Sequence, residues 1–260
     1  MRTVRDAGLL RRREGFYYIV FTALAVALGG IVTGMVLLGD SWFQLLMAGA
    51  LGIVLTQIAF VTHEASHRQI FASGKVNDWV GRILATAVVG ISYHWWMHKH
   101  SRHHAKPNQK GADPDIEPDT IVFTEADAEK STGFLALITR RQGYLFFPLL
   151  TLEGINLHLR SVLTLFEKGK VEHRYLELTL IFLRLSLYIT AIFLFLPLGM
   201  AFAFIGVQMA VFGVYMGASF APNHKGMPIL ENDTSLDFLH RQILTSRNLK
   251  GGWWATVMFG

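Results

Sequence analysis

Four apolar runs, each about as long as a lipid bilayer is thick, constrain the fold of this chain more than any other feature. A helix needs about 20 predominantly apolar residues to cross roughly 30 Å of hydrocarbon. Four stretches of the 260-residue sequence meet that length, at about 16–38, 42–62, 178–197 and 200–221. Charged residues make up 17% of the chain, against about 25% in soluble domains. The sequence therefore predicts an all-α integral membrane protein whose four transmembrane helices form two hairpins.

The positions of the basic residues predict how these hairpins are oriented. Neither short connection, at 39–41 or 197–199, contains lysine or arginine, whereas the segment 63–177 holds fourteen of the 24 basic residues. Cytoplasmic loops are enriched in such residues, so we expect the N-terminus, the segment 63–177 and the tail 222–260 to be cytoplasmic. The net charge of +5 is then a consequence of topology, and we expect no nucleic-acid partner.

Two weaker apolar stretches, 79–93 and 134–152, lie within this cytoplasmic segment. Each contains arginine, and we expect helices that lie at the membrane surface or are buried in the protein. The stretch 105–130 between them is rich in proline and acidic residues, which predicts a solvated loop. We therefore expect a single domain over residues 1–260, with a cytoplasmic helical cap that carries the histidine motifs.

Three separate groups of histidine lie on the expected cytoplasmic side. Residues i and i+4 share one face of a helix, so the two histidines of "HEASH" (63–67) can bind one ion together. In "HKHSRHH" (98–104), three histidines fall within an arc of about 100°. His94 and His98 point to another side and are interpreted as structural, or as contacts to the ligands rather than ligands themselves. Three single histidines are interpreted as unrelated to metal binding: His158, His173 and His240. The candidate metal ligands are His63, His67, His100, His103, His104 and His224.

The number and type of these side chains limit the metal. No cysteine is present, which excludes thiolate-ligated zinc and iron–sulfur sites. Six imidazoles exceed the three protein ligands typical of catalytic zinc, and imidazole also suits iron and copper. We therefore expect a two-iron centre that activates oxygen. The alternative is a membrane zinc protease in which Glu64 of H-E-x-x-H is the base and His224 or Asp78 is the third zinc ligand, but it leaves the 100–104 group unexplained.

Four stretches, taken in order along the chain, resemble one protein family. They are "HEASH", "WWMHKHSRHHAKPNQKGADPD", "FAPNHKGMP" and "LHRQILTSRNLKGG", and from about residue 57 onward the chain is similar to the membrane fatty acid desaturases, in particular the bacterial acyl-lipid type. The resemblance implies oxygen-dependent introduction of a cis double bond into a fatty acyl chain, carried on a lipid or a thioester, at two non-haem irons on the cytoplasmic face. Nothing in the sequence resembles a fused cytochrome b5, so two electrons would come from an external ferredoxin-like donor. A related di-iron hydroxylase is the alternative within this resemblance.

The resemblance also assigns roles to single residues. It implies five iron ligands and a sixth histidine at or close to the metal: His63, His67, His100, His103 and His104, with His224 as the sixth. Glu64 would orient an imidazole, and Asn223 would reach the metal through water. The acyl chain would lie against Trp95, Trp96 and the inner faces of the spans.

The sequence departs from the family pattern near residue 260. Family members carry a further Q-x-x-H-H box downstream of the "TSRN" stretch, but no histidine follows His240 in this sequence. We therefore expect either a fragment of an active enzyme or a truncated, catalytically inactive relative.

Overall fold

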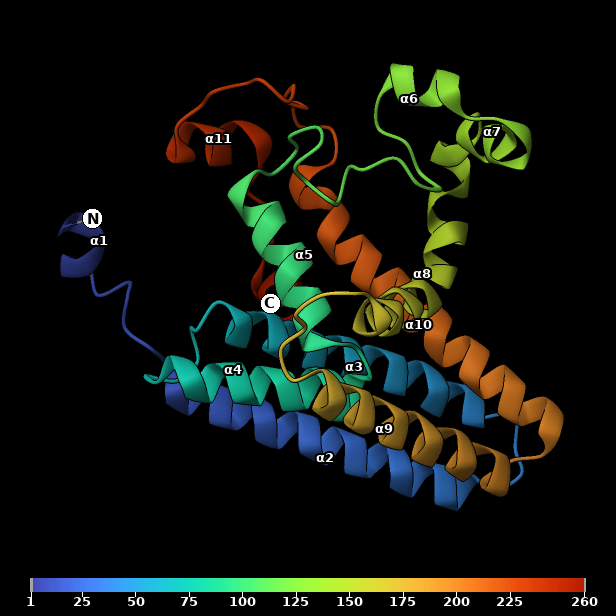
Figure 1. The fold of residues 1–260 in the computed structure, drawn as a ribbon. Coiled ribbons are helices and arrows are strands. Elements are labelled where there is room, and N and C mark those ends of the chain that lie inside the picture. The colour runs from blue at the N-terminus through green and yellow to red at the C-terminus, as the bar shows by residue number, and fades with distance from the viewer. Residues whose placement is uncertain (1, 260) are drawn as a thin grey trace.

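The computed structural model describes residues 2–259, apart from the side chain of Thr256, and these residues are almost entirely helical (Figure 1). Within this range the only extended pairing is an isolated bridge between Gln109 and Leu230. Four helices are long and apolar enough to cross a membrane: α2 (Glu14–Leu38), α3 (Gln44–Ser66), α9 (Arg174–Phe195) and α10 (Leu198–His224). The predicted all-α membrane fold with four spans is confirmed.

The four long helices are arranged as two hairpins. α2 and α3 are joined through Gly39, which adopts a φ of +54°, and α9 and α10 are joined through Pro197. Figure 1 shows α2 beside α3, whereas α10 diverges from α9 and crosses toward α3 and α8. Residues from both hairpins therefore meet at the upper end of α10.

Both histidine-bearing spans extend beyond their predicted ends. α3 continues through His63 to Ser66, and α10 continues to His224. Hydropathy marks the part of a helix that fits the hydrocarbon, whereas backbone hydrogen bonding continues into the polar residues that follow. As a result, His63 and His224 lie in the last turns of these helices, and His67 directly follows α3.

Shorter helices connect and follow the two hairpins. Between the hairpins the chain forms α4 (Gly74–Ile83), the π-helix η1 (Leu84–Val89) and α5 (Tyr93–Ala105). The stretch 79–93, expected to be helical, is thus divided: Gly90, with a φ of +97°, ends η1 and turns the chain toward α5. Other short helices are α1 (Arg2–Asp6), α6 (Glu125–Lys130), α11 (Phe238–Thr245) and α12 (Trp253–Phe259).

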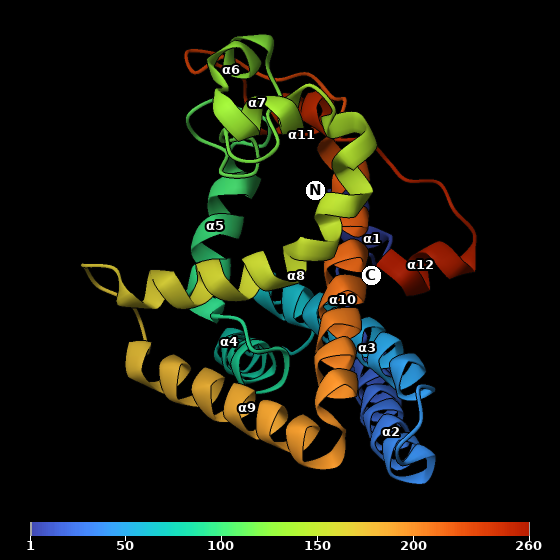
Figure 2. The same ribbon diagram turned by 90° about the vertical axis from the view of Figure 1, so that its right-hand side faces the viewer.

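The second weak stretch, 134–152, is also divided between two helices. α7 (Gly133–Thr139) ends shortly before α8 (Gln142–Phe166), and α8 contains Pro148. Proline cannot donate the helical hydrogen bond and crowds the preceding turn, and Figure 2 shows α8 bent. One part of α8 therefore packs against α10 while the other rises away from the bundle.

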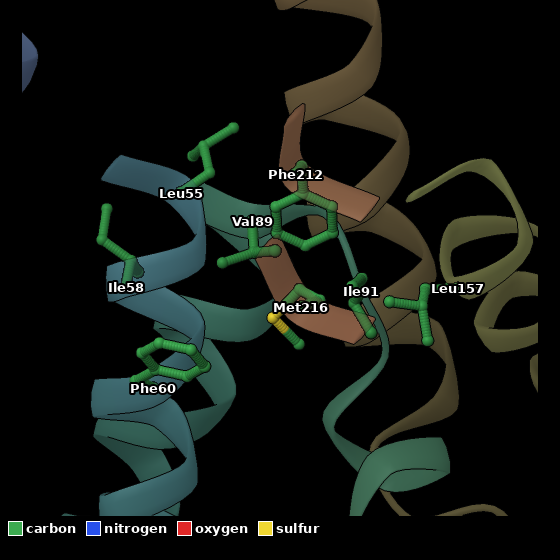
Figure 3. Packing of buried hydrophobic residues seen from close by; sticks show 8 residues of the cluster. All are labelled: Leu55, Ile58, Phe60, Val89, Ile91, Leu157, Phe212 and Met216. Atoms are coloured by element: carbon green, nitrogen blue, oxygen red, sulfur yellow. The ribbon is translucent and has the colours of Figure 1, made fainter. Parts of the chain in front are cut away.

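A hydrophobic cluster holds α3, η1, α8 and α10 together (Figure 3). α3 contributes Leu55, Ile58 and Phe60, and Phe212 of α10 is fully buried among them and their neighbours. Burying a side chain of this size stabilises the fold by roughly 1.5–3 kcal/mol. The cluster therefore fixes the relative positions of the helices that carry His63 and His224.

α8 and α10 approach each other so closely that glycine is required at their crossing. A Cβ atom on Gly213 would collide with the backbone of Leu150 and Gly154, and a Cβ atom on Gly154 would collide with the carbonyl group of Met209. Because the obstacles are backbone atoms of a neighbouring helix, they cannot move aside as a flexible side chain can. The two glycines set the distance between α8 and α10.

We predict that Gly213→Ala destabilises the protein by about 1–3 kcal/mol, the usual cost of overpacking a core. Gly206→Ala is the matched control, because it changes the same helix at a position where a Cβ atom would meet nothing within 4 Å. The free energy of unfolding of both variants is measured by detergent titration in mixed micelles. Equal stabilities of the two variants would contradict this account of the crossing.

A buried ion pair fixes the start of α5 against α4 and α9. Arg82 donates to Glu177, whose side chain is fully buried. Glu177 also accepts hydrogen bonds from the hydroxyl of Ser92 at 2.6 Å and from the backbone N–H of His94 at 3.2 Å. The Glu177 carboxylate therefore lies at the N-terminus of α5, where backbone N–H groups lack helical partners.

We predict that Arg82→Ala lowers the free energy of unfolding by about 3–5 kcal/mol, since it leaves the buried Glu177 without its counter-ion. Arg68→Ala removes an exposed ion pair with Asp78, whose N···O distance is 3.2 Å, and should cost about 1 kcal/mol or less. Thermal unfolding of both variants in detergent provides the comparison. The prediction fails if loss of Arg82 is as mild as loss of Arg68.

Candidate metal centre

The end of α3 presents two histidines to the same point. His63 lies in the last turn of α3 and His67 follows the helix directly, so their side chains share one face. Their Nε2 atoms lie 3.3 Å apart. The pair forms the first part of the site, as the i and i+4 spacing predicts.

α5 brings two more histidines to this pair. The Nε2 atom of His100 lies 2.9 Å from that of His67, and the ring of His104 lies 4.3 Å from the ring of His100 and 4.8 Å from that of His67. Each of the four side chains offers one ring nitrogen, and these four nitrogens all lie within 4.8 Å of one another. Residues separated by more than thirty positions in the sequence thus form one cluster, here called the four-histidine group: His63, His67, His100 and His104.

The four-histidine group has the chemistry of a metal site. Two nitrogens bound to one ion at about 2.1 Å would lie roughly 3.0–3.4 Å apart, close to the observed separations. Burial and the neighbouring imidazoles lower the pKa of His67, that of His100 and, to about 4, that of His104. The three imidazoles are therefore neutral at pH 7, with lone pairs available to a cation. A transition-metal ion fits this donor set.

A second pair of histidines lies beside this group. The Nε2 atoms of His103 and His224 are 3.2 Å apart. His103 donates from Nδ1 to Asp113 at 3.0 Å, and His224 donates from Nδ1 to the carbonyl oxygen of Thr245 at 3.0 Å. Because an acceptor occupies each Nδ1 atom, Nε2 is the nitrogen on each ring that can bind an ion in the neutral form. The two Nε2 atoms face each other, and a second ion fits here.

Asp113 is the residue that the sequence pattern missed. The stretch 105–130 predicts a solvated loop, but the Asp113 side chain is fully buried and its carboxylate accepts from His103 and from the backbone N–H groups of Asn108 and Asp115. The prediction of a solvated loop is wrong at Asp113. The loop folds back onto α5, and the buried Nδ1–H group of His103 finds its hydrogen-bond acceptor in this carboxylate. The "HH…DPD" spacing alone gives no sign of that contact.

Asp115 adds a second carboxylate near His103. Its Oδ2 atom lies 3.3 Å from the Nδ1 atom of His103, and its Oδ1 atom lies 2.6 Å from the Lys99 ammonium nitrogen. Burial lowers the pKa of His103, but the hydrogen bond to Asp113 and the charge of Asp115 outweigh it and leave that pKa raised. His103 therefore differs electrostatically from the four-histidine group.

Glu64 contacts the ligands without joining them. Its Oε2 atom accepts a hydrogen bond from the hydroxyl of Tyr17 on α2 at 3.1 Å, and its Oε1 atom lies 3.8 Å from the Nδ1 atom of His63. The carboxylate is thus positioned beside an imidazole, in keeping with the orienting role that we expected for it.

The histidines interpreted as structural lie apart from the two groups. His158 is buried, and its ring nitrogens contact the carbonyl oxygens of Gly154 and Val89. The ring of His173 contacts that of Trp79 at a tilt of 54°, and His240 is exposed and pairs with Asp237. His94 and His98 line a separate surface hollow on the other side of α5.

A cavity of about 700 Å³ opens at the histidines. Trp96 lines it and stacks on His100 with 4.6 Å between ring centroids, whereas Trp95 packs against the hydrophobic cluster. Of the two tryptophans expected along an acyl chain, only Trp96 therefore faces the cavity, and Asn223 also lines it. The apolar wall comes mainly from α8 and α10: Phe146, Leu149, Leu150, Leu157, Met216 and Phe220.

Known proteins resemble this chain in sequence. The model of the family described as fatty acid desaturase matches residues 40–260. A Delta(8)-fatty-acid desaturase from Helianthus annuus is 29% identical over 190 residues, which are 68% of this chain and 42% of that protein. An acyl-lipid (9-3)-desaturase from Borago officinalis is 24% identical over 184 residues, 66% of this chain and 41% of that protein.

A further acyl-lipid (9-3)-desaturase, from Physcomitrium patens, is 25% identical over 219 residues, 77% of this chain and 39% of that protein. This chain spans about two fifths of the length of these curated relatives. The family match covers most of the chain and includes every candidate ligand from His63 to His224. The chain belongs to the fatty acid desaturase family.

Proposed function

We propose that this protein introduces a cis double bond into a fatty acyl chain, using molecular oxygen at a two-iron centre. The balanced reaction removes two hydrogens from adjacent carbons and, with two electrons and two protons from outside, reduces one oxygen molecule to two water molecules. When bound, iron supplies the activation of oxygen for this reaction. The proposal rests on family membership and on imidazoles that line a cavity whose wall is apolar on the side of α8 and α10.

The observation that carries the proposal is the division of the histidines into two adjacent groups. The four-histidine group would hold one ion, and the pair of His103 and His224 would contribute to a second. The two groups are joined by consecutive residues of α5, since the rings of His103 and His104 lie 5.5 Å apart. Adjacent ligands on one helix would hold two ions side by side. Imidazole is a suitable ligand for iron.

The cavity supports an acyl substrate. Its apolar wall, formed largely by Leu149, Leu150 and Met216, offers no hydrogen-bond partner to water and suits a hydrocarbon chain. Trp96 covers one side of His100 and limits access of solvent from that direction. The chain's own residues would therefore bind the substrate, hold it beside the imidazoles and reduce its exposure to water.

The distribution of charge supports a cytoplasmic site. Apart from Arg184, which lies within α9, the basic residues flank the spans on the side where the histidines lie, and they are absent from both short connections. We propose that the N-terminus, the metal centre and residues 222–260 are cytoplasmic, and that a soluble ferredoxin-like protein delivers the electrons there. The substrate would be a fatty acyl lipid or an acyl thioester.

A zinc protease fits the site less well. Such an enzyme needs Glu64 free to act on water, but Glu64 accepts a hydrogen bond from Tyr17 and lies beside His63. It would also leave His103, with its buried partner Asp113, without a role. Purified protein that contains zinc in place of iron, at one ion per chain, would restore that hypothesis.

We predict that His100→Ala reduces the double-bond product to background when the protein is expressed in a host deficient in desaturase activity. His98→Ala is the matched control, because His98 lies two residues away on α5 but faces the separate surface hollow, and it should retain most activity. Mass spectrometry of the cellular fatty acids measures the product, as a loss of two hydrogens per chain.

Three outcomes of this experiment would contradict the proposal. A gain of one oxygen atom would identify a hydroxylase, and equal activity of the two variants would remove His100 from the site. A wild-type chain that makes no new unsaturated product, although it contains iron and the host supplies a reduced ferredoxin, would identify an inactive relative.

A further inference from the structure

We infer that Asp113 is a positioning residue, whose carboxylate fixes the orientation of His103 and thereby builds the second of the two ion positions. The inference rests on the proposed function and goes beyond it by making the two positions chemically unequal. The evidence is the set of hydrogen bonds that the buried Asp113 carboxylate makes with His103 and with the backbone of its own loop.

The Asp113 carboxylate is held from several directions. Its Oδ2 atom accepts the backbone N–H of Asn108 at 2.7 Å, and its Oδ1 atom accepts the backbone N–H of Asp115 at 2.9 Å. The side chain is fully buried, so water does not compete for these acceptor sites. Each oxygen thus has a backbone donor, and the two hydrogen bonds hold the carboxylate in one orientation.

The fixed carboxylate determines which nitrogen of His103 carries hydrogen. The Nδ1 atom lies 3.0 and 3.1 Å from the two Asp113 oxygens, and a carboxylate that already accepts two N–H groups acts as an acceptor toward a third. Hydrogen therefore resides on Nδ1, which leaves Nε2, the nitrogen that faces His224, as the one that can bind an ion. A carboxylate behind a metal-binding histidine fixes its tautomer and raises its basicity.

No other histidine of the site has such a partner among the described residues. His224 donates to a backbone carbonyl group, and the nearest carboxylate oxygen to His63 is 3.8 Å away, longer than a hydrogen bond. The four-histidine group is therefore assembled without a carboxylate hydrogen-bonded to any of its rings, whereas the second position depends on an anion. Removing that anion should weaken one ion position and spare the other.

The same loop also links α5 to the end of α10. Asn108 donates from its side chain to the carbonyl oxygens of His224 and Pro228, and Gln109 donates to those of Glu231 and Asn232. A change in the loop could therefore disturb the site merely by moving α10. Gln109 provides a control for this effect, because it anchors the loop without contacting His103.

The test is anaerobic titration of the purified full-length protein with Fe(II), followed by elemental analysis of bound iron. The wild type should bind two irons per chain. Asp113→Asn should lower the affinity of one site by about 10- to 100-fold, the usual effect of losing a partner of a metal ligand, and leave the other unchanged. Asp113→Ser is a second variant, which avoids placing an amide N–H against the backbone donors.

Two further variants separate positioning from structural support. Gln109→Ala should keep both sites at wild-type affinity. His103→Ala should weaken the same site as Asp113→Asn, and the double variant should lose no more affinity than His103→Ala alone, since residues that act through one another are not additive. A purely structural role would give additive losses.

The outcomes distinguish this inference from the proposed function. Two tightly bound irons in both Asp113 variants would overturn the inference alone, as would an equal loss of iron in Gln109→Ala or additive losses in the double variant. A wild-type protein that takes up no iron would overturn the proposed function and the inference together.

Discussion

The position of α5 depends on a buried carboxylate at each of its ends. At the N-terminus, Glu177 accepts from Ser92 and from the backbone of His94 while it pairs with Arg82. Near the C-terminus, Asp113 accepts from His103. An unpaired buried charge costs several kcal/mol, so neither contact can be exchanged for water at low cost. The candidate ligands on α5, which are His100, His103 and His104, therefore keep one orientation toward α3 and α10.

The packing of α3, α8 and α10 fixes the helices that face the histidines of α5. The hydrophobic cluster joins α3, α8 and α10, and the contact of Gly154 with Gly213 fixes how closely α8 approaches α10. The same two helices form most of the apolar wall of the cavity. The packing of one helix crossing therefore contributes both to the stability of the fold and to the wall of the cavity beside the histidines.

Sequence periodicity predicts the spans and the grouping of histidines, but it cannot predict contacts between distant segments. The apolar runs locate α2, α3, α9 and α10 to within a few residues, because bilayer thickness imposes a length. The i and i+4 spacing likewise predicts the pair of His63 and His67. Asp113 was assigned to a solvated loop because its neighbours are polar, and only the tertiary fold shows that it is buried against His103. The π-helix η1 and the bend in α8 depend on packing in the same way.

The location of the site at helix ends has an electrostatic consequence. His63, His103 and His224 lie in the last turns of α3, α5 and α10, so three helix C-termini converge on one region. Each C-terminus carries roughly half a negative charge from its unpaired carbonyl groups, and this charge favours a nearby cation by about 0.3–1 kcal/mol at exposed positions. The fold therefore attracts positive charge before any side chain is considered. Neutral imidazoles can use that field, because they add lone pairs without the repulsion that a further set of carboxylates would introduce. Asp113, the fully buried carboxylate beside His103, would then distinguish one proposed ion position from the other.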